Sequence, residues 1–76
     1  MTTEAIIHEV SEELDRAESQ FPKINTPHEG YAIILEELDE FWDECKVNQS
    51  RRSLNDMRNE LIQVAAMAIR TIKDTL

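Results

Sequence analysis

The sequence has one cysteine and no apolar run long enough to cross a membrane. Cys45 can form neither an internal disulfide nor a thiolate metal cluster, so we expect a small buried apolar residue in a reducing cytoplasm. The longest uninterrupted apolar run, VAAMAI, is far shorter than the roughly 20 residues that span a bilayer. The N-terminus lacks the basic segment and apolar run of a signal peptide. These absences predict a soluble cytoplasmic protein.

Basic residues are scarce compared with acidic ones. Eight lysines and arginines stand against 16 aspartates and glutamates, which gives a formal net charge of -8. Such a charge repels a phosphodiester backbone and an anionic membrane surface unless a cation intervenes. We therefore expect neither a nucleic acid polymer nor a membrane among the partners of this protein.

Glycine and proline are confined to one short segment. Gly30, Pro22 and Pro27 are the only residues of these types, and no strand-like alternation of useful length occurs anywhere. The remaining segments carry apolar residues at helical spacing. We therefore predict an all-α fold, in which residues 1–76 form a single domain of three antiparallel helices. The expected helices cover residues 3–20, 27–47 and 53–74.

Each expected helix is preceded by a residue that can cap it. The candidates are Thr2 or Thr3 for the first helix, Thr26 for the second, and Ser50 or Ser53 for the third. Hydroxyl side chains at these positions accept hydrogen bonds from the free N–H groups of the first turn. Pro27 follows Thr26 directly, and proline is favoured at the first helical position. These residues predict where the three helices begin.

The second expected helix has one broad apolar face, which must pack against something. Its residues are Tyr31, Ile34, Leu35, Leu38, Phe41, Trp42 and Cys45. Trp42 and Tyr31 could stack on a nucleobase, but their position on this face favours a place in the core.

The third expected helix is apolar almost all round at Leu61–Ile69. The residues expected to face the other two helices are Leu54, Met57, Leu61, Val64, Ala65, Ala68 and Ile72. Ala66 and Met67 point roughly the opposite way and would need a different cover. In so short a chain the natural cover is another subunit. We therefore expect a larger helical bundle formed by homo-oligomerisation.

Acidic residues gather on the other side of the second helix. Glu36, Glu37, Glu40 and Glu44 lie there, and like charges three or four residues apart cost a few tenths of a kcal/mol per pair. A divalent cation held by carboxylate oxygens would relieve this repulsion. An acidic face that is merely solvated is the alternative, because carboxylate spacing alone is a weak motif. Glu60, at the rim of the third helix, could join such a site.

EELDEF in the second helix, followed by NELIQVAAMAIR in the third, resembles the all-α nucleoside triphosphate pyrophosphohydrolases, the MazG-like family. The signature of that family is ExxE on one helix and ExxD on the next, and the resemblance covers about residues 28–72. It implies that Glu37, Glu40 and Glu60 bind Mg²⁺, with Mn²⁺ as the alternative. Gln63 occupies the position of the family's aspartate, and its amide offers the metal an oxygen without a charge. Either three glutamates suffice, Glu36 or Glu44 assists, or metal binding is weaker.

The resemblance also implies an activity and an assembly. Members of the family hydrolyse a nucleoside or deoxynucleoside triphosphate to the monophosphate and pyrophosphate. Glu36 or Glu40 would then be the catalytic general base that orients the attacking water. The family forms dimers or dimers of dimers, which implies a homodimer or homotetramer here. Its core usually has four helices, so a neighbouring subunit could complete the site of this three-helix chain.

Two features leave the function open. Arg51 and Arg52, between the second and third helices, could bind the substrate phosphates as a bidentate clamp, but an exposed basic pair near a helix start is more often ordinary surface. Gln63 in place of an aspartate raises a second possibility for the whole protein. The alternative is a non-catalytic acidic helical module that binds a nucleotide, a metal or a protein partner.

Overall fold

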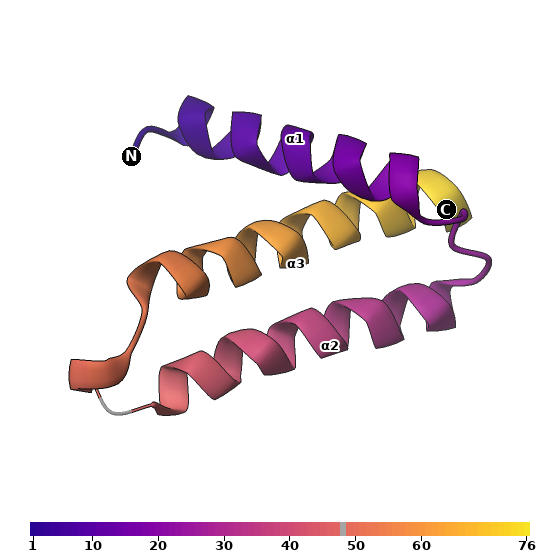
Figure 1. The fold of residues 1–76 in the computed structure, drawn as a ribbon. Coiled ribbons are helices and arrows are strands. Elements are labelled where there is room, and N and C mark those ends of the chain that lie inside the picture. Colours follow the sequence, from indigo (N-terminus) through magenta and orange to yellow (C-terminus); the bar gives the residue numbers. More distant parts are fainter. Residues whose placement is uncertain (48) are drawn as a thin grey trace.

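The structure of the protein is a computed structural model, which describes residues 1–47 and 49–76. It contains three long helices, α1 (Thr3–Gln20), α2 (Pro27–Lys46) and α3 (Leu54–Thr75), and a short 3-10 helix, η1 (Gln49–Arg51) (Figure 1). The described residues include no strand. The predicted all-α fold and its three helices are therefore confirmed. No helix in the described part of the chain has the length and apolar character needed to cross a membrane.

The three long helices begin at the predicted caps. The bonds, each 3.1 Å long, run from Ala5 N to Thr2 Oγ1, from Glu29 N to Thr26 Oγ1, and from Asp56 N to Ser53 Oγ. A cap of this kind stabilises a helix by about 1 kcal/mol. The carboxylate of Glu29 also accepts a hydrogen bond from the backbone N–H of Asn25, at 3.1 Å. Two hydrogen bonds, one to the Thr26 hydroxyl and one to the Glu29 carboxylate, thus fix the start of α2.

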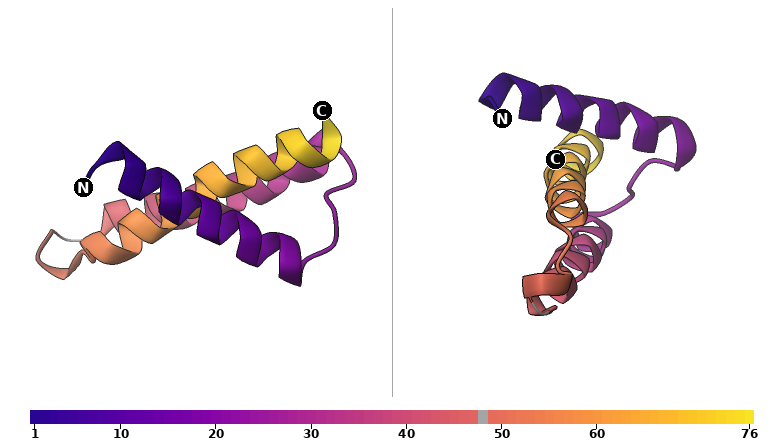
Figure 2. Two further views of the ribbon diagram at one scale, coloured as in Figure 1. Left: turned by 90° about the horizontal axis from the view of Figure 1, so that it is seen from above. Right: turned by 60° about the vertical axis from the view of Figure 1, so that its left-hand side comes forward.

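The central helix is α3. Among the described residues, the backbones of α1 and α2 each approach α3 and do not approach one another. Successive long helices run in opposite directions, and α3 lies between the other two (Figure 1). Two further views show that α2 runs alongside α3, whereas α1 crosses α3 obliquely (Figure 2). Side chains of α3 therefore have neighbours on two sides.

The small core lies where the two outer helices meet α3. Val10 and Ala17 from α1 pack with Ala66 and Met67 from α3. The partly buried residues around this cluster are Leu14, Ile33, Ile34, Ile62 and Ala65. Ala66 has no exposed surface, and Met67 is 6% exposed. The short side chain of Ala66 lets α1 come close to α3.

The predicted orientation of α3 was wrong in part, since Met57, Val64, Ala65 and Ala68 are half-buried as residues that face a neighbour would be. Ala66 and Met67, which were expected to need a neighbouring subunit, are buried within the chain itself. Leu54, Leu61 and Ile72, which were expected to face the other helices, are 75%, 45% and 60% exposed. The apolar sequence of this helix does not reveal which sides its neighbours occupy, because all sides look similar. The oblique crossing of α1 settles the orientation.

The apolar face of α2 is also divided. Ile34, Phe41 and Cys45 are half-buried, so Cys45 is less enclosed than predicted. Tyr31 and Trp42 are 67% and 57% exposed. The prediction that both lie in the core is therefore wrong for the single chain. The face spans a wider arc than one neighbouring helix can cover.

A buried arginine ties the loop between α1 and α2 to the end of α3. Arg70 is 4% exposed, and its guanidinium donates a hydrogen bond to the backbone carbonyl of Pro22. Its Nε lies 3.8 Å from the carboxylate of Asp74. The same carboxylate accepts a 2.9 Å hydrogen bond from the backbone N–H of Ile24, a fully buried loop residue. The loop is therefore held by charged groups and by apolar burial together.

Gly30 sets the closest approach of α2 to α3. A Cβ atom at this position would lie 2.4 Å from Thr71 Cγ2 and 2.6 Å from Thr71 Oγ1. Such distances are shorter than van der Waals contact, so any larger residue would force the two helices apart. Glycine is therefore required here for packing, although it is a poor helix former.

We predict that Gly30→Ala lowers the free energy of unfolding by about 1–2 kcal/mol. Overpacking against Thr71 costs about 1–3 kcal/mol. The better helix propensity of alanine offsets up to about 1 kcal/mol of this cost. Urea denaturation would measure the change. In the double variant with Thr71→Ala the same substitution should cost much less, with Thr71→Ala alone as the reference. An equal loss in both backgrounds would contradict the close contact.

Candidate metal centre

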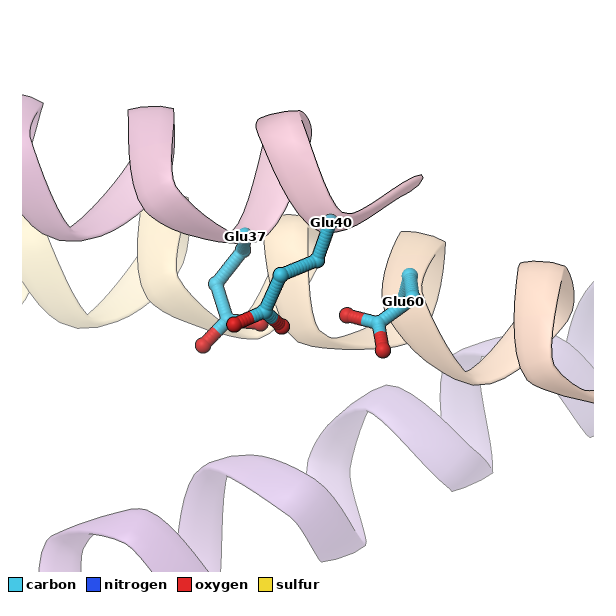
Figure 3. Close-up of side chains that lie close together, drawn as sticks. All are labelled: Glu37, Glu40 and Glu60. Carbon is cyan, nitrogen blue, oxygen red and sulfur yellow. The ribbon is translucent and has the colours of Figure 1, made fainter. Parts of the chain in front are cut away.

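Three carboxylates from two helices converge in the middle of the molecule. Glu37 and Glu40 are three residues apart on α2, so they share one face of that helix. Glu60 approaches them from α3, and one oxygen from each of the three side chains lies within 4.8 Å of the others. The two side chains of α2 point in the same direction, and the carboxylate of Glu60 is turned toward them (Figure 3). Three of the four predicted metal ligands are thus brought together.

The environment of Glu37 and Glu60 disfavours their ionised forms. Burial, followed by the negative charges of Glu40 and Glu60, raises the pKa of Glu37 to about 7. Burial also raises the pKa of Glu60, as do a hydrogen bond with Glu40 and the charge of Glu40. The reason is that each carboxylate loses water and gains like-charged neighbours. The centre therefore stores electrostatic repulsion that a cation would relieve.

Two oxygen atoms of this cluster have no partner. Oε2 of Glu37 and Oε2 of Glu60 are buried, and neither accepts a hydrogen bond. A buried acceptor without a partner costs about 1–3 kcal/mol. Carboxylate oxygens are the ligands that Mg²⁺ prefers in proteins, together with water. The residues present therefore fit a magnesium or manganese ion.

A cavity of about 400 Å³ opens beside Glu37, between α1, the loop at 21–26, α2 and α3. Its lining combines charged and apolar residues: Glu13, Arg16, Ala17, Phe21, Pro22, Ile24, Glu29, Ile33, Glu36, Glu37, Gln63, Met67 and Arg70. A volume of this size lies within the range of small-molecule sites. The cavity therefore has room for a ligand next to the carboxylates.

The other residues predicted for the metal centre are Gln63, Glu36 and Glu44, and they differ in where they lie. Gln63 and the exposed Glu36 line the cavity together with Glu37, so their roles as neutral ligand and general base stay predictions. Glu44 lies outside the cluster, because its carboxylate accepts a 2.7 Å hydrogen bond from Ser53 N at the start of α3. This bond gives Glu44 a structural role.

The predicted phosphate clamp has no support from the geometry. Arg52 donates hydrogen bonds to the carbonyls of Cys45, at 2.8 Å, and Val47, at 3.4 Å. Its guanidinium therefore satisfies carbonyl groups at the C-terminal end of α2. Arg51 is exposed in η1, and neither arginine lines the cavity beside Glu37. Phosphate binding by this pair stays a prediction.

The sequence analysis missed the two arginines that line the cavity. Arg16, on α1, binds the carboxylate of Glu13 and donates a 2.9 Å hydrogen bond to Gln20. Arg70 is held by the loop, as described above. Arg70 lies seven residues after Gln63 on α3, so helical spacing could have placed the two on one face. No local signal places Arg16 near Glu37, because α1 reaches the cavity only through its oblique crossing over α3.

Comparison of the chain with protein-family models, with curated proteins and with solved structures found no match. The candidate metal centre therefore depends on the geometry of this chain and on the spacing of its acidic residues.

We predict that Glu37 makes the metal-free protein less stable as the pH rises. The folded state binds the proton of Glu37 more tightly than the unfolded state does, since the folded pKa is about 7 and the ordinary value is 4.5. The associated stability is present below the ordinary pKa and is lost as the pH rises through the folded pKa. Glu37→Gln should therefore raise the midpoint of thermal unfolding more at pH 8 than at pH 5.

Unfolding would be followed in a chelator, with Asp39→Asn as the matched control. Asp39 is an exposed acid of the same helix and is not part of the cluster. A similar effect of the two substitutions at both pH values would contradict the proposed environment of Glu37.

Proposed function

We propose that this protein is a metal-dependent nucleoside triphosphate pyrophosphohydrolase. The observation that carries the proposal is the convergence of Glu37, Glu40 and Glu60 beside a cavity, with two buried carboxylate oxygens left without partners. The resemblance of the two acidic motifs to the MazG-like family supports the same activity. The substrate would be a ribo- or deoxynucleoside triphosphate, and the products would be the monophosphate and pyrophosphate.

The three glutamates would hold Mg²⁺, or Mn²⁺ in its place, and the amide oxygen of Gln63 would add a neutral ligand. When bound, such an ion shields the phosphate charges and lowers the pKa of a coordinated water. Because Glu37 also lines the cavity, an ion held by the three glutamates would lie at the edge of the cavity, and the triphosphate would bind there. The pKa of Glu37, raised to about 7, implies that the metal-free centre binds a proton near neutral pH, and a metal would have to displace it.

The chemical step needs a base for the attacking water. Glu36 lines the cavity and is not one of the three converging carboxylates, so it can take a proton from water without leaving a metal. The water oxygen would form a bond to the α-phosphorus as the bond to the bridging oxygen breaks, and pyrophosphate would leave. Glu40 is the second candidate for the base, although its place in the cluster favours metal binding.

The cavity would accommodate the nucleoside. Phe21, Ile24, Ile33 and Met67 form apolar parts of its lining, and polar side chains lie among them. A flat aromatic base with polar edges fits a lining of this mixed character. The nucleoside would then enter the cavity, while the triphosphate stays at the carboxylates.

A non-catalytic acidic module is the second candidate function. Gln63 favours it, because an amide in place of a carboxylate removes one negative charge from the metal centre. Such a module would bind a metal or a nucleotide without hydrolysis.

Assembly and location remain predictions. Ala66 and Met67 no longer argue for a homodimer or homotetramer, because both are buried within the chain. A cytoplasmic location is proposed from the single cysteine.

We predict that the protein releases pyrophosphate from at least one nucleoside triphosphate in the presence of Mg²⁺ or Mn²⁺. Glu37→Gln should lower the rate by at least roughly 100-fold, because loss of a charged ligand weakens the hold on the ion and on the transition-state charge. Chromatography of a panel of ribo- and deoxynucleotides would separate monophosphate from diphosphate products. Asp39→Asn should keep the full rate, and circular dichroism would verify that both variants are folded.

Mn²⁺ binding measured by electron paramagnetic resonance separates the two candidate functions. Binding by the folded wild type that Glu37→Gln abolishes, without turnover of any nucleotide, would favour the non-catalytic module. If Gln63→Asp then hydrolyses a nucleotide, the lack of turnover in the wild type would be due to Gln63. Turnover that Glu37→Gln leaves unchanged would contradict the metal centre itself.

A further inference from the structure

Arg16 is the cation that α1 presents to the cavity beside Glu37. It lines the cavity from α1, whereas Glu36 and Glu37 line it from α2. The three clustered carboxylates point toward the side on which α1 passes (Figure 3). The hydrogen bond and the charge of Glu13 raise the pKa of the Arg16 guanidinium, and the charge of Glu37 raises it further. Arg16 therefore lies within electrostatic reach of the candidate metal centre.

Neighbouring side chains of α1 hold the guanidinium of Arg16 in place and leave part of it free. Its Nε and Nη2 donate to the carboxylate of Glu13, and its Nη1 donates a 2.9 Å hydrogen bond to Gln20. These contacts use three of the five N–H groups of an arginine, so one remains on each terminal nitrogen. The side chain is 48% exposed. A guanidinium fixed in this way can donate to two oxygens of a phosphate.

The other arginine of the cavity lining is already used by the fold. Arg70 is 4% exposed, donates a hydrogen bond to the carbonyl of Pro22 and lies 3.8 Å from Asp74. The lining contains four glutamates in addition to the two arginines. A polyphosphate carries several negative charges, and such a lining repels it unless cations compensate. Among the described residues of the lining, Arg16 is therefore the cation that can meet a phosphate beside a metal ion.

Arg16 lies at the end of the cavity away from the loop. It also lines a second hollow of about 420 Å³, whose other residues are Glu9, Glu12, Glu13, Asn59 and Ile62. Phe21 and Ile24 line the first cavity and not the second.

On α3 the boundary between the two hollows falls beside Glu60. Asn59 and Ile62 line the second hollow, and Gln63 lines the first. Arg16 marks the same boundary on α1, because it lines both hollows. A nucleoside placed at the loop would therefore direct its phosphates toward the carboxylates and Arg16 together.

We propose that Arg16, in the pyrophosphohydrolase proposed above and resting on that function, binds the β- and γ-phosphates of the substrate. As the water oxygen bonds to the α-phosphorus and its proton passes to Glu36, the electron pair of the broken bond stays on the bridging oxygen. Negative charge therefore grows on the pyrophosphate as it leaves. A positioned guanidinium beside this group stabilises that charge. Arg16 would thus favour a triphosphate over a diphosphate, which lacks one of the two groups that it binds.

Binding of pyrophosphate measures this contact without any turnover. In calorimetry with Mg²⁺ and pyrophosphate, Arg16→Gln should lower the affinity by at least about tenfold, because charge-assisted hydrogen bonds are lost. A nucleoside monophosphate should bind the wild type and the variant equally, since it lacks both of these phosphates. Mn²⁺ binding, followed by electron paramagnetic resonance, should not weaken in the variant, because Arg16 is not a metal ligand.

Lys46→Gln is the matched control. Lys46 also pairs with an acid three residues earlier on its helix, at 3.4 Å from Asp43, and it does not line the cavity. The control removes the same charge and should keep the wild-type affinity for pyrophosphate. Equal affinity in the wild type and Arg16→Gln, an equal loss in Arg16→Gln and Lys46→Gln, or no binding of pyrophosphate by the wild type would overturn the role of Arg16.

Arg16→Lys covers the case in which Arg16→Gln does not fold, because a lysine can still pair with Glu13. It should also bind pyrophosphate more weakly than the wild type, since lysine lacks the planar fork of an arginine. Wild-type affinity in Arg16→Lys would contradict the proposed contact.

The two readouts separate the role of Arg16 from the proposed activity. If no nucleotide is hydrolysed, the activity fails, and a selective loss of pyrophosphate binding in Arg16→Gln still supports the phosphate contact. If the wild type hydrolyses triphosphates, Arg16→Gln should lower kcat/KM more for a triphosphate than for the corresponding diphosphate. Unchanged kcat and KM in Arg16→Gln would leave the activity in place and overturn the role of Arg16.

Discussion

The close packing of α2 against α3 is the constraint on which the rest of the molecule depends. Gly30 lets the two helices approach because its missing side chain makes room for Thr71. The same approach brings Glu60 of α3 within reach of Glu37 and Glu40 on α2. A wider separation of the helices would break the carboxylate cluster and loosen the cavity beside it. One small residue therefore links the packing of the fold to the geometry of the candidate site.

The carboxylate cluster is the least favourable part of the structure for stability. Burial and like charge raise the pKa values of Glu37 and Glu60, and two buried oxygens lack hydrogen-bond partners. A folded chain with a small core has little free energy to offset such losses. Perturbed acids of this kind concentrate at functional sites, because chemistry and ligand binding need groups that water does not satisfy. The cluster is therefore the candidate functional site of the described chain.

The spacing of apolar residues predicts where helices form better than it predicts which of their side chains are buried. The stretch around Ala66 is apolar on every side, so periodicity could not show that Ala66 and Met67 point inward while Leu61 points outward. Tyr31 and Trp42 share the apolar face of α2 with Ile34, yet one neighbouring helix covers only part of that face. Arg16 reaches the cavity through the crossing of α1, which leaves no local pattern in the sequence.

The sequence by itself determined the helices of this protein and the common face of two of its clustered glutamates. Thr26, Pro27 and Ser53 fix helix starts through local hydrogen bonds and backbone angles, and the spacing of Glu37 and Glu40 fixes their common face. These features depend on residues within one turn of helix, so they are legible along the chain. Only the tertiary structure decided that Glu60 meets them, that Glu44 and Arg52 serve helix ends, and which apolar residues stay exposed. Those outcomes depend on the angles and distances between helices, which contacts among distant residues set together.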